Sequence, residues 1–317
     1  MNREEGLDLI LRIEKNINGI LIGKEDVVRL TLTGIIAGGH ILIEDTPGTG
    51  KTLMAKLIAA SIKGDFSRIQ FTPDLLPADI TGLNIYNRSK SEFEFVRGPV
   101  FTNILLADEI NRATPRTQSA LLESMEERQV TVDGRTYTLN EPFVVLATEN
   151  PVETAGTFPL PEAQLDRFIM HLSMGSLSPA DEVLMLNTIE EQGKADRVTA
   201  VCDLEDIVKI RELAHEVYIH DDLKEYLVAI VQKTRDNVKV HMGVSPRGTL
   251  WLMRAARAYA FIMGRDHVLP DDIKYLAPLV LSHRIMAYTG SDIATKRTII
   301  GEVLSSVEVP SEDWSRR

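Results

Sequence analysis

The stretch His40–Ala60 reads HILIEDTPGTGKTLMAKLIAA, and its residue types and spacing suit the binding of phosphate. Phosphate-binding loops surround their ligand with backbone N–H groups at a helix N-terminus and add one lysine. Here Gly48 and Gly50 allow the backbone to curl beneath the phosphates. Lys51 can reach the β- and γ-phosphates of a nucleotide, and the Thr52 hydroxyl can bind Mg²⁺. The stretch therefore predicts a phosphate site between a strand and a helix.

An aspartate, Asp45, occupies the position where the first glycine of this loop pattern belongs. That position eases the turn at the strand exit and does not itself hold phosphate. We expect nucleotide binding to survive if the Asp45 side chain points away from the ligand. Taken alone, the altered loop also fits a glycine-rich turn without any ligand. Other residues must therefore decide between a phosphate site and a simple turn.

Acidic and amide side chains follow two later apolar stretches. NILLADE ends in Asp108 and Glu109, and VVLATENP carries Asn150. Asp108 can hold Mg²⁺ through water together with Thr52, and Glu109 can orient and deprotonate an attacking water. Asn150 can hold that water against a γ-phosphate. A helix cap for the acidic pair and a turn asparagine before Pro151 are the alternatives for each motif alone, but their order after a phosphate loop favours nucleotide hydrolysis.

The elements that must position these residues follow an alternating pattern. Near-continuous apolar runs predict strands of a parallel sheet that is covered on both faces, and amphipathic segments such as 52–62 and 115–127 predict helices between them. The strand candidates are 40–44, 68–71, 103–108, 143–148 and 168–172. The first part of the chain therefore predicts an α/β fold around a parallel sheet of five strands.

Two insertions interrupt this pattern. Residues 83–98 indicate a strand, a polar turn and a second strand, and residues 129–139 indicate a hairpin with Asp133-Gly134 as its turn. Each also fits an ordinary surface hairpin.

The chain changes character near residue 175. The strand signals stop at about Ser176, and six amphipathic segments follow, for example one in which Ser245 caps, Pro246 opens and Gly264 ends a helix. We therefore expect an α/β domain over residues 1–174 and an all-helical domain over residues 175–317.

Composition excludes several classes of function. The 317 residues carry a net charge of −11, and both the first 174 residues and the remainder are acidic, which argues against a broad nucleic-acid footprint. The seven histidines show no metal-ligand spacing, and the single cysteine, Cys202, cannot form an internal disulfide. No apolar run approaches the roughly 20 residues of a membrane span. The first residues favour an amphipathic helix over a secretion signal, so we expect a cytoplasmic protein.

With these motifs in order, the sequence resembles the AAA+ ATPases and, within them, the MoxR family. The resemblance is carried by GTFPLPEAQLDRFIMHL (156–172), FTPDLLPADITG (71–82) and GPVFTNILLADEINRA (98–113), and it covers nearly the whole chain. Residues other than glycine are familiar in this family at the position of Asp45. The resemblance implies ATP and Mg²⁺ as ligands and ATP hydrolysis as the activity.

The resemblance also implies roles for matching residues. Asn150 would be the first sensor, Arg167 the arginine finger that reaches a neighbouring subunit's ATP, and Arg247 the second sensor that links the helical part to the nucleotide. An ion pair with Asp166 or Glu162 is the alternative for Arg167. The catalytic set is Glu109, Asn150, Arg167 and Lys51, the metal ligands are Thr52 and Asp108, and the nucleotide contacts are Ile22, Gly23, Pro47, Gly48, Thr49, Gly50, Lys51, Thr52, Leu53 and Arg247.

An arginine finger that acts across subunits implies a homo-oligomer, and the resemblance implies a hexameric ring. It further implies remodelling or maturation of a partner protein, with metal insertion as one outcome and a von Willebrand factor A domain as the usual partner. Both insertions match hairpins that face the pore or a partner in such rings. The alternatives are a nucleic-acid motor related to MCM helicases, which the acidic charge disfavours, and a nucleotide-gated scaffold without hydrolysis, which Glu109, Asn150 and Arg167 disfavour.

Overall fold

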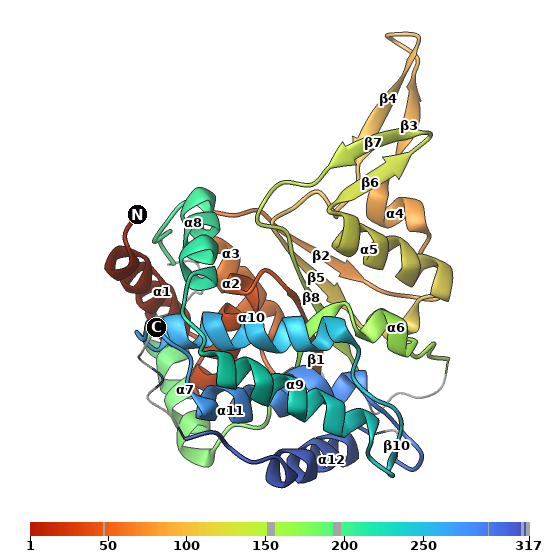
Figure 1. Ribbon diagram of the computed structural model, residues 1–317. Helices are drawn as coiled ribbons and strands as arrows, with labels where there is room; N and C mark the ends of the chain where they lie inside the picture. Colours follow the sequence, from red (N-terminus) through yellow and green to blue (C-terminus); the bar gives the residue numbers. More distant parts are fainter. Residues whose placement is uncertain (47, 151–155, 193–197, 291, 312–313, 315–317) are drawn as a thin grey trace.

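The structure, a computed structural model, describes residues 1–46, 48–150, 156–192, 198–290, 292–311 and 314. The five apolar runs form one parallel sheet in the order β2-β5-β8-β1-β9 (Figure 1). Its strands are β1 (His40–Glu44), β2 (Phe66–Gln70), β5 (Ile104–Asp108), β8 (Val144–Glu149) and β9 (Phe168–Leu172). The predicted α/β fold with a five-stranded parallel sheet is therefore confirmed.

The sheet is buried on both faces, because successive side chains of its central strands point alternately into two hydrophobic clusters. Ile41 and Ile43 of β1 belong to one cluster, and Leu42 between them belongs to the other. β5 and β8 divide in the same way, since Leu106 and Leu146 join the first cluster and their neighbours join the second. This burial explains why the strands read as continuous apolar runs.

Helices cover the two faces. The first cluster includes buried residues of α1, α2 and α3, and the second includes residues of α5 and of the short α4. A capping box between Asn2 and Glu5 begins α1. The bounds are α1 (Arg3–Asn18), α2 (Glu25–Ile36), α3 (Lys51–Ser61), α4 (Pro77–Thr81) and α5 (Pro115–Glu127). The α2 helix had not been predicted, since its β-branched apolar residues are weak helix signals.

Both predicted hairpins are present and project together from one end of the body (Figure 1). Phe95 of the first hairpin stacks on Tyr137 of the second with ring centroids 4.2 Å apart, and Asn84 donates a hydrogen bond to Asp133. Asp133 and Gly134 take φ angles of 49° and 75°, as the predicted turn requires. The strands are β3 (Gly82–Asn87), β4 (Glu92–Arg97), β6 (Gln129–Val132) and β7 (Arg135–Thr138). The paired hairpins are called the arm below.

The six predicted helices after residue 175 are present. They are α7 (Pro179–Gln192), α8 (Leu204–His215), α9 (Asp221–Arg235), α10 (Pro246–Ile262), α11 (Pro270–Leu281) and α12 (Ile293–Ser306). The prediction that strands stop at Ser176 was wrong at two places, because β10 (Val240–Met242) and β11 (Met286–Ala287) pair antiparallel. Runs this short leave no periodic signal. Three further short helices are η1 (Ile110–Arg112), α6 (Glu162–Leu165) and η2 (Ser282–Arg284).

The helical part packs directly on the rest of the chain. Buried residues of α8, α10 and α11 belong to the same hydrophobic cluster as those of α1 and α2. The buried Arg284 donates a hydrogen bond of 2.8 Å to Asp166, just before β9. The division near residue 174 stays a prediction, since this cluster includes residues from both sides of it.

Candidate active site

Two adjoining cavities lie at the carboxyl edge of the sheet, where β1, β5 and β8 are neighbours. The larger has a volume of about 1050 Å³, and the smaller has a volume of about 430 Å³. Asp45, Gly48, Gly50 and Leu53 line both of them, so the loop after β1 separates the two spaces. Such an edge is the usual place for a ligand in an open parallel sheet.

The loop itself has the geometry of a phosphate cradle. Gly48 and Gly50 have φ angles of +87° and +98°, a backbone conformation that favours glycine. Gly50 caps α3, so the helix N-terminus faces the loop. Lys51 Nζ donates to the carbonyl oxygens of Asp45 and Thr46, both at 2.9 Å, and burial lowers the pKa of Lys51. Thr49 lines the larger cavity and Thr52 the smaller, while Pro47 lies outside the described residues.

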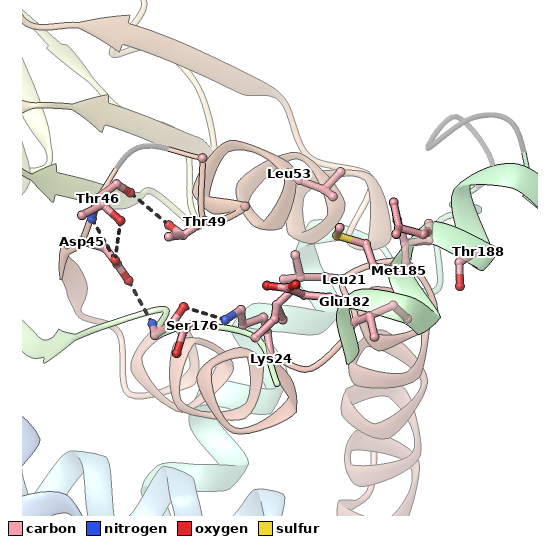
Figure 2. A pocket seen from close by; sticks show the side chains of 17 residues that line it. Leu21, Lys24, Asp45, Thr46, Thr49, Leu53, Ser176, Glu182, Met185 and Thr188 are labelled. Atoms are coloured by element: carbon pink, nitrogen blue, oxygen red, sulfur yellow. Dashed lines mark hydrogen bonds between the residues drawn. The ribbon is translucent and has the colours of Figure 1, made fainter. Parts of the chain in front are cut away.

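Asp45 is held at the rim by its own hydrogen-bond donors. Its Oδ2 accepts from the Gly175 N–H at 2.9 Å and from the Ser173 hydroxyl at 3.3 Å. Its Oδ1 accepts from the Thr46 N–H at 2.8 Å. Figure 2 shows the carboxylate directed at the segment that leads from β9 to α7. The aspartate thus joins the loop to that segment.

The larger cavity has an apolar end opposite the loop. Leu21 and Met185 face one another there beside Leu53 (Figure 2). Ile22 also lines this cavity, and its contact with the nucleotide stays a prediction. Gly23 does not line it, but a Cβ there would come within 2.9 Å of Asp181. An apolar slot beside a phosphate cradle suits a nucleobase.

Some residues of this cavity are not predicted by the sequence. The buried Lys24 donates to the carbonyl oxygens of Met174 and Gly175 at 2.8 and 2.7 Å. Met185 and Leu186 come from α7, which sequence analysis read only as the first helix of the helical part. Only the path of the chain after β9 brings that helix to the loop.

The smaller cavity gathers the acidic pair. Asp108 Oδ1 accepts from the buried Thr148 hydroxyl at 2.6 Å, and its Oδ2 accepts from Arg68 at 2.6 and 3.2 Å. The Thr148 hydroxyl also accepts from the Glu109 N–H at 2.8 Å. Lys51, Thr52, Asp108, Glu109 and Asn150 all line this cavity, together with Arg68, Gln70, Thr148 and Glu149.

The Glu109 carboxylate has two donors. Its Oε2 accepts from Gln70 at 2.8 Å and from Arg112 at 3.1 Å. The Glu109 backbone has φ +55°, an uncommon value for a side-chain-bearing residue and one that functional sites often hold. Arg68, Gln70 and Thr148 were not predicted, because they meet the acidic pair only through the neighbouring positions of β2, β5 and β8.

These residues fit a Mg²⁺ ion that is bound with a nucleotide. A hydroxyl from Thr52 and a carboxylate from Asp108 are the hard oxygen ligands that Mg²⁺ prefers. Within the described part of the chain, no three His, Cys, Asp or Glu side chains cluster as a metal site. A cation here would complete its shell with phosphate oxygens and water.

The two predicted arginines lie elsewhere. Arg247 makes a two-pronged contact with Glu126 at 2.6 and 3.1 Å, and Arg167 Nε lies 3.5 Å from the same carboxylate. Arg167 also donates to the Leu122 carbonyl oxygen. Neither arginine lines either cavity. The ion pair weighed for Arg167 with Asp166 or Glu162 is thus replaced by one with Glu126. Arg247 thus lies outside both cavities of its own chain, and its role as the second sensor stays a prediction.

Comparisons with known proteins agree with this geometry. The AAA model of the ATPase family associated with various cellular activities matches residues 40–170, and the AAA lid domain matches residues 232–303. Bacillus subtilis YeaC is 50% identical over 95% of each chain, and Mycobacterium tuberculosis chaperone MoxR1 is 41% identical over 92% of this chain and 80% of its own. A crystal structure of a proposed ATPase from Cytophaga hutchinsonii superposes with a TM-score of 0.89 at 38% identity, covering 98% and 97% of the chains.

The chain belongs to the MoxR family of AAA+ ATPases. The resemblance stated from the sequence is confirmed, and so is the ATPase class of activity. The family favours an ATPase of the chaperone type over the MCM-like alternative. In the described part of this MoxR-family chain, no helix is long and apolar enough to cross a membrane.

One further acid of this ATPase lines the smaller cavity. Glu149, the last residue of β8, stands opposite Glu44 in the strand register. Burial and the nearby Glu44 carboxylate raise the pKa of Glu149 to about 7. His171 lies 3.1 Å from Glu44, and this hydrogen bond lowers the pKa of Glu44. The sequence gave no sign of this pairing, because the two glutamates are distant along the chain.

Proposed function

We propose that this MoxR-family protein binds ATP with Mg²⁺ across the two cavities and hydrolyses the β–γ phosphoanhydride bond. The observation that carries the proposal is the convergence of Lys51, Thr52, Asp108, Glu109 and Asn150 on one cavity from three neighbouring strand ends. The adenine base of ATP would occupy the apolar end near Leu21 and Ile22, and the phosphates would lie along the loop after β1.

Each residue of the smaller cavity has a role in this proposal. Lys51 and the loop N–H groups bind the phosphates, and Thr52 and Asp108 hold the cation, which neutralises phosphate charge. Glu109 accepts a proton from the attacking water, and Asn150 holds that water in line. Since Gln70 donates to Glu109, the carboxylate is oriented before the water arrives. Thr148 fixes the distance between the metal ligand and the base.

The arginines complete the site from a second copy. Arg167 and Arg247 approach one another at Glu126 and lie away from the cavities of their own chain. We propose that both enter the ATP site of the next protomer and stabilise charge on the γ-phosphate. A head-to-tail interface of this kind closes into a ring, here a hexamer.

The work done by the ring is proposed to be remodelling or maturation of a partner protein, including metal insertion, in the cytoplasm. The similar MoxR1 is named a chaperone, which supports this class of work. We propose a partner with a von Willebrand factor A domain. The arm is suited to contact it because Phe93, Ile85 and Val96 are exposed apolar side chains on a projecting hairpin.

Mixing two inactive variants tests the shared site. Lys51→Ala removes the cradle and Arg167→Ala removes the finger, so each variant alone should hydrolyse ATP at no more than background rate. A random equal mixture should regain activity at about a quarter of its sites, where an intact cradle meets an intact finger. Mixed complexes that are isolated through two different affinity tags and still show no activity would refute completion of the site between protomers.

A further inference from the structure

Arg68 is a cation in the smaller cavity that the proposed chemistry does not use. It lies in the middle of β2, an edge strand, and its side chain is 47% exposed. Its Nη2 and Nε donate to Asp108 Oδ2 at 2.6 and 3.2 Å. Nη2 also donates to Gln70 Oε1 at 2.8 Å. The guanidinium therefore lies against the carboxylate assigned to the cation.

Both oxygens of Asp108 are thus engaged, and by partners of different kinds. Oδ1 accepts from Thr148, a short and buried side chain that β8 holds in place. Among the described residues, Oδ2 accepts from Arg68, a long side chain that is exposed over much of its surface. A cation that uses Oδ2, directly or through water, competes with the arginine for that oxygen, because two positive groups close to one carboxylate oxygen repel one another.

We propose that Arg68 is a positioning residue that competes with Mg²⁺ for Asp108. This inference rests on the proposed function and adds to it the exchange of Arg68 for Mg²⁺ at Asp108. Before the cation binds, Arg68 neutralises Asp108 and lowers the repulsion between that carboxylate and the phosphates. When the cation binds, Arg68 leaves Oδ2 and stays in the cavity through Gln70. This arginine therefore raises the Mg²⁺ concentration that nucleotide binding requires.

A purely structural role for Arg68 predicts a different outcome. If the pair only fastened β2 to β5, its loss would weaken nucleotide binding with and without Mg²⁺ alike. Competition predicts changes of opposite sign. Without Mg²⁺, loss of Arg68 leaves Asp108 unneutralised beside the phosphates, so the nucleotide binds more weakly. With Mg²⁺, the same loss removes a competitor, so a lower Mg²⁺ concentration suffices.

The test measures binding of a fluorescent ATP analogue to the full chain, in EDTA and across a Mg²⁺ titration. For Arg68→Ala and the more conservative Arg68→Gln, affinity in EDTA should fall about threefold to tenfold, and the half-maximal Mg²⁺ concentration should fall by a similar factor. Arg88→Ala removes an exposed arginine at the tip of the arm and should match the wild type in both measurements.

A second pair of variants checks that the effect passes through Asp108. In an Asp108→Asn background, Arg68→Ala should no longer lower the half-maximal Mg²⁺ concentration, because the amide leaves no carboxylate for which the two cations compete. Equal half-maximal Mg²⁺ concentrations in the wild type and both folded Arg68 variants would overturn the exchange and leave ATP binding intact. A wild-type chain that binds no nucleotide at any Mg²⁺ concentration would overturn the proposed function as well.

Discussion

The cavity after β1, β5 and β8 and the arginine pair at Glu126 differ in how their charges are matched. In the cavity, Asp108 and Glu109 each have protein donors of their own. At Glu126, two guanidinium groups share one carboxylate, and Asp166, 4.0 Å from Arg247, is already paired with Arg284. In the cavity, the two carboxylates are matched by donors of the same chain. At Glu126, three guanidinium groups of the described residues lie around two carboxylates, so positive charge is in excess. This difference agrees with the proposal that the site is divided between two copies of the chain.

Replacing the proposed base gives the largest expected effect. Glu109→Gln should lower ATP turnover by about a hundredfold to ten-thousandfold, because the amide cannot accept the proton of the attacking water. Nucleotide affinity should stay within about threefold of wild type, since the side chain does not belong to the cradle. Steady-state phosphate release and calorimetry measure the two quantities. Glu123→Gln, an exposed glutamate on α5, is the control. Unchanged turnover in Glu109→Gln would contradict the assignment of the base.

Arg247→Ala separates the two regions more directly. We expect ATP turnover of the assembled protein to fall by about tenfold to a hundredfold, because one donor to the developing phosphate charge is lost. The nucleotide affinity of dilute, unassembled chains should not change, since Arg247 lies outside both cavities of its own chain. Arg254→Ala, two turns further along α10, should change neither quantity. A loss of affinity in the unassembled Arg247→Ala chain would place this arginine at its own nucleotide.

The sequence predicted the elements whose signals are local. The central strands β1, β5 and β8 are apolar runs. Lys51 begins α3, and Asp108 and Asn150 stand at the ends of β5 and β8, where the motifs indicate them. Contacts that depend on strand order could not be predicted. Arg68 reaches Asp108 only because β2 pairs with β5, although 40 residues separate them in sequence.

Distance along the chain also hid the partner of Arg247. That arginine meets Glu126 across a sequence separation of 121 residues, in a contact between the helical part and α5. A pattern at the start of α10 indicates a cap and a first turn, and it holds no information about the facing helix. The position of Arg247 therefore needed the structure.

Glu149, which lines the smaller cavity, should make the stability of the fold depend on pH. The pKa of Glu149 is about 7 in the folded chain, whereas an unfolded glutamate releases its proton near the ordinary pKa of 4.5. The unfolded chain therefore binds fewer protons between these values, and stability falls as pH rises through this window. Glu149→Gln should raise the free energy of unfolding by about 1–3 kcal/mol at about pH 8 and by little at about pH 5.

Denaturant unfolding at both pH values checks this expectation. The control is again Glu123→Gln, because that glutamate is exposed and its replacement should leave the pH dependence unchanged. Equal pH dependence in Glu149→Gln and wild type would show that Glu149 is ionised in the folded chain.

The smallest effect is expected at the rim of the cradle. Asp45→Asn keeps an acceptor oxygen for the Gly175 N–H but removes a negative charge that lines both cavities. ATP affinity should therefore rise by about twofold to fivefold, as for loss of one partly exposed repulsive charge. Calorimetric titration measures the change, with the exposed Asp236→Asn as control. A marked loss of affinity would mean that the charge itself holds the loop in shape.

The packing of α8, α10 and α11 against α1 and α2 affects how force can be transmitted. A large rotation of the C-terminal helices would expose the hydrophobic cluster that they share with α1 and α2. It would also break the hydrogen bonds of the buried Arg284 to Asp166 and to the β9 carbonyl oxygens. Each protomer would then move as a rigid body. The movement of the proposed ring during ATP hydrolysis would be concentrated at the interfaces between protomers. Spin labels on α10 and β5 of one protomer should keep their separation throughout the ATP cycle.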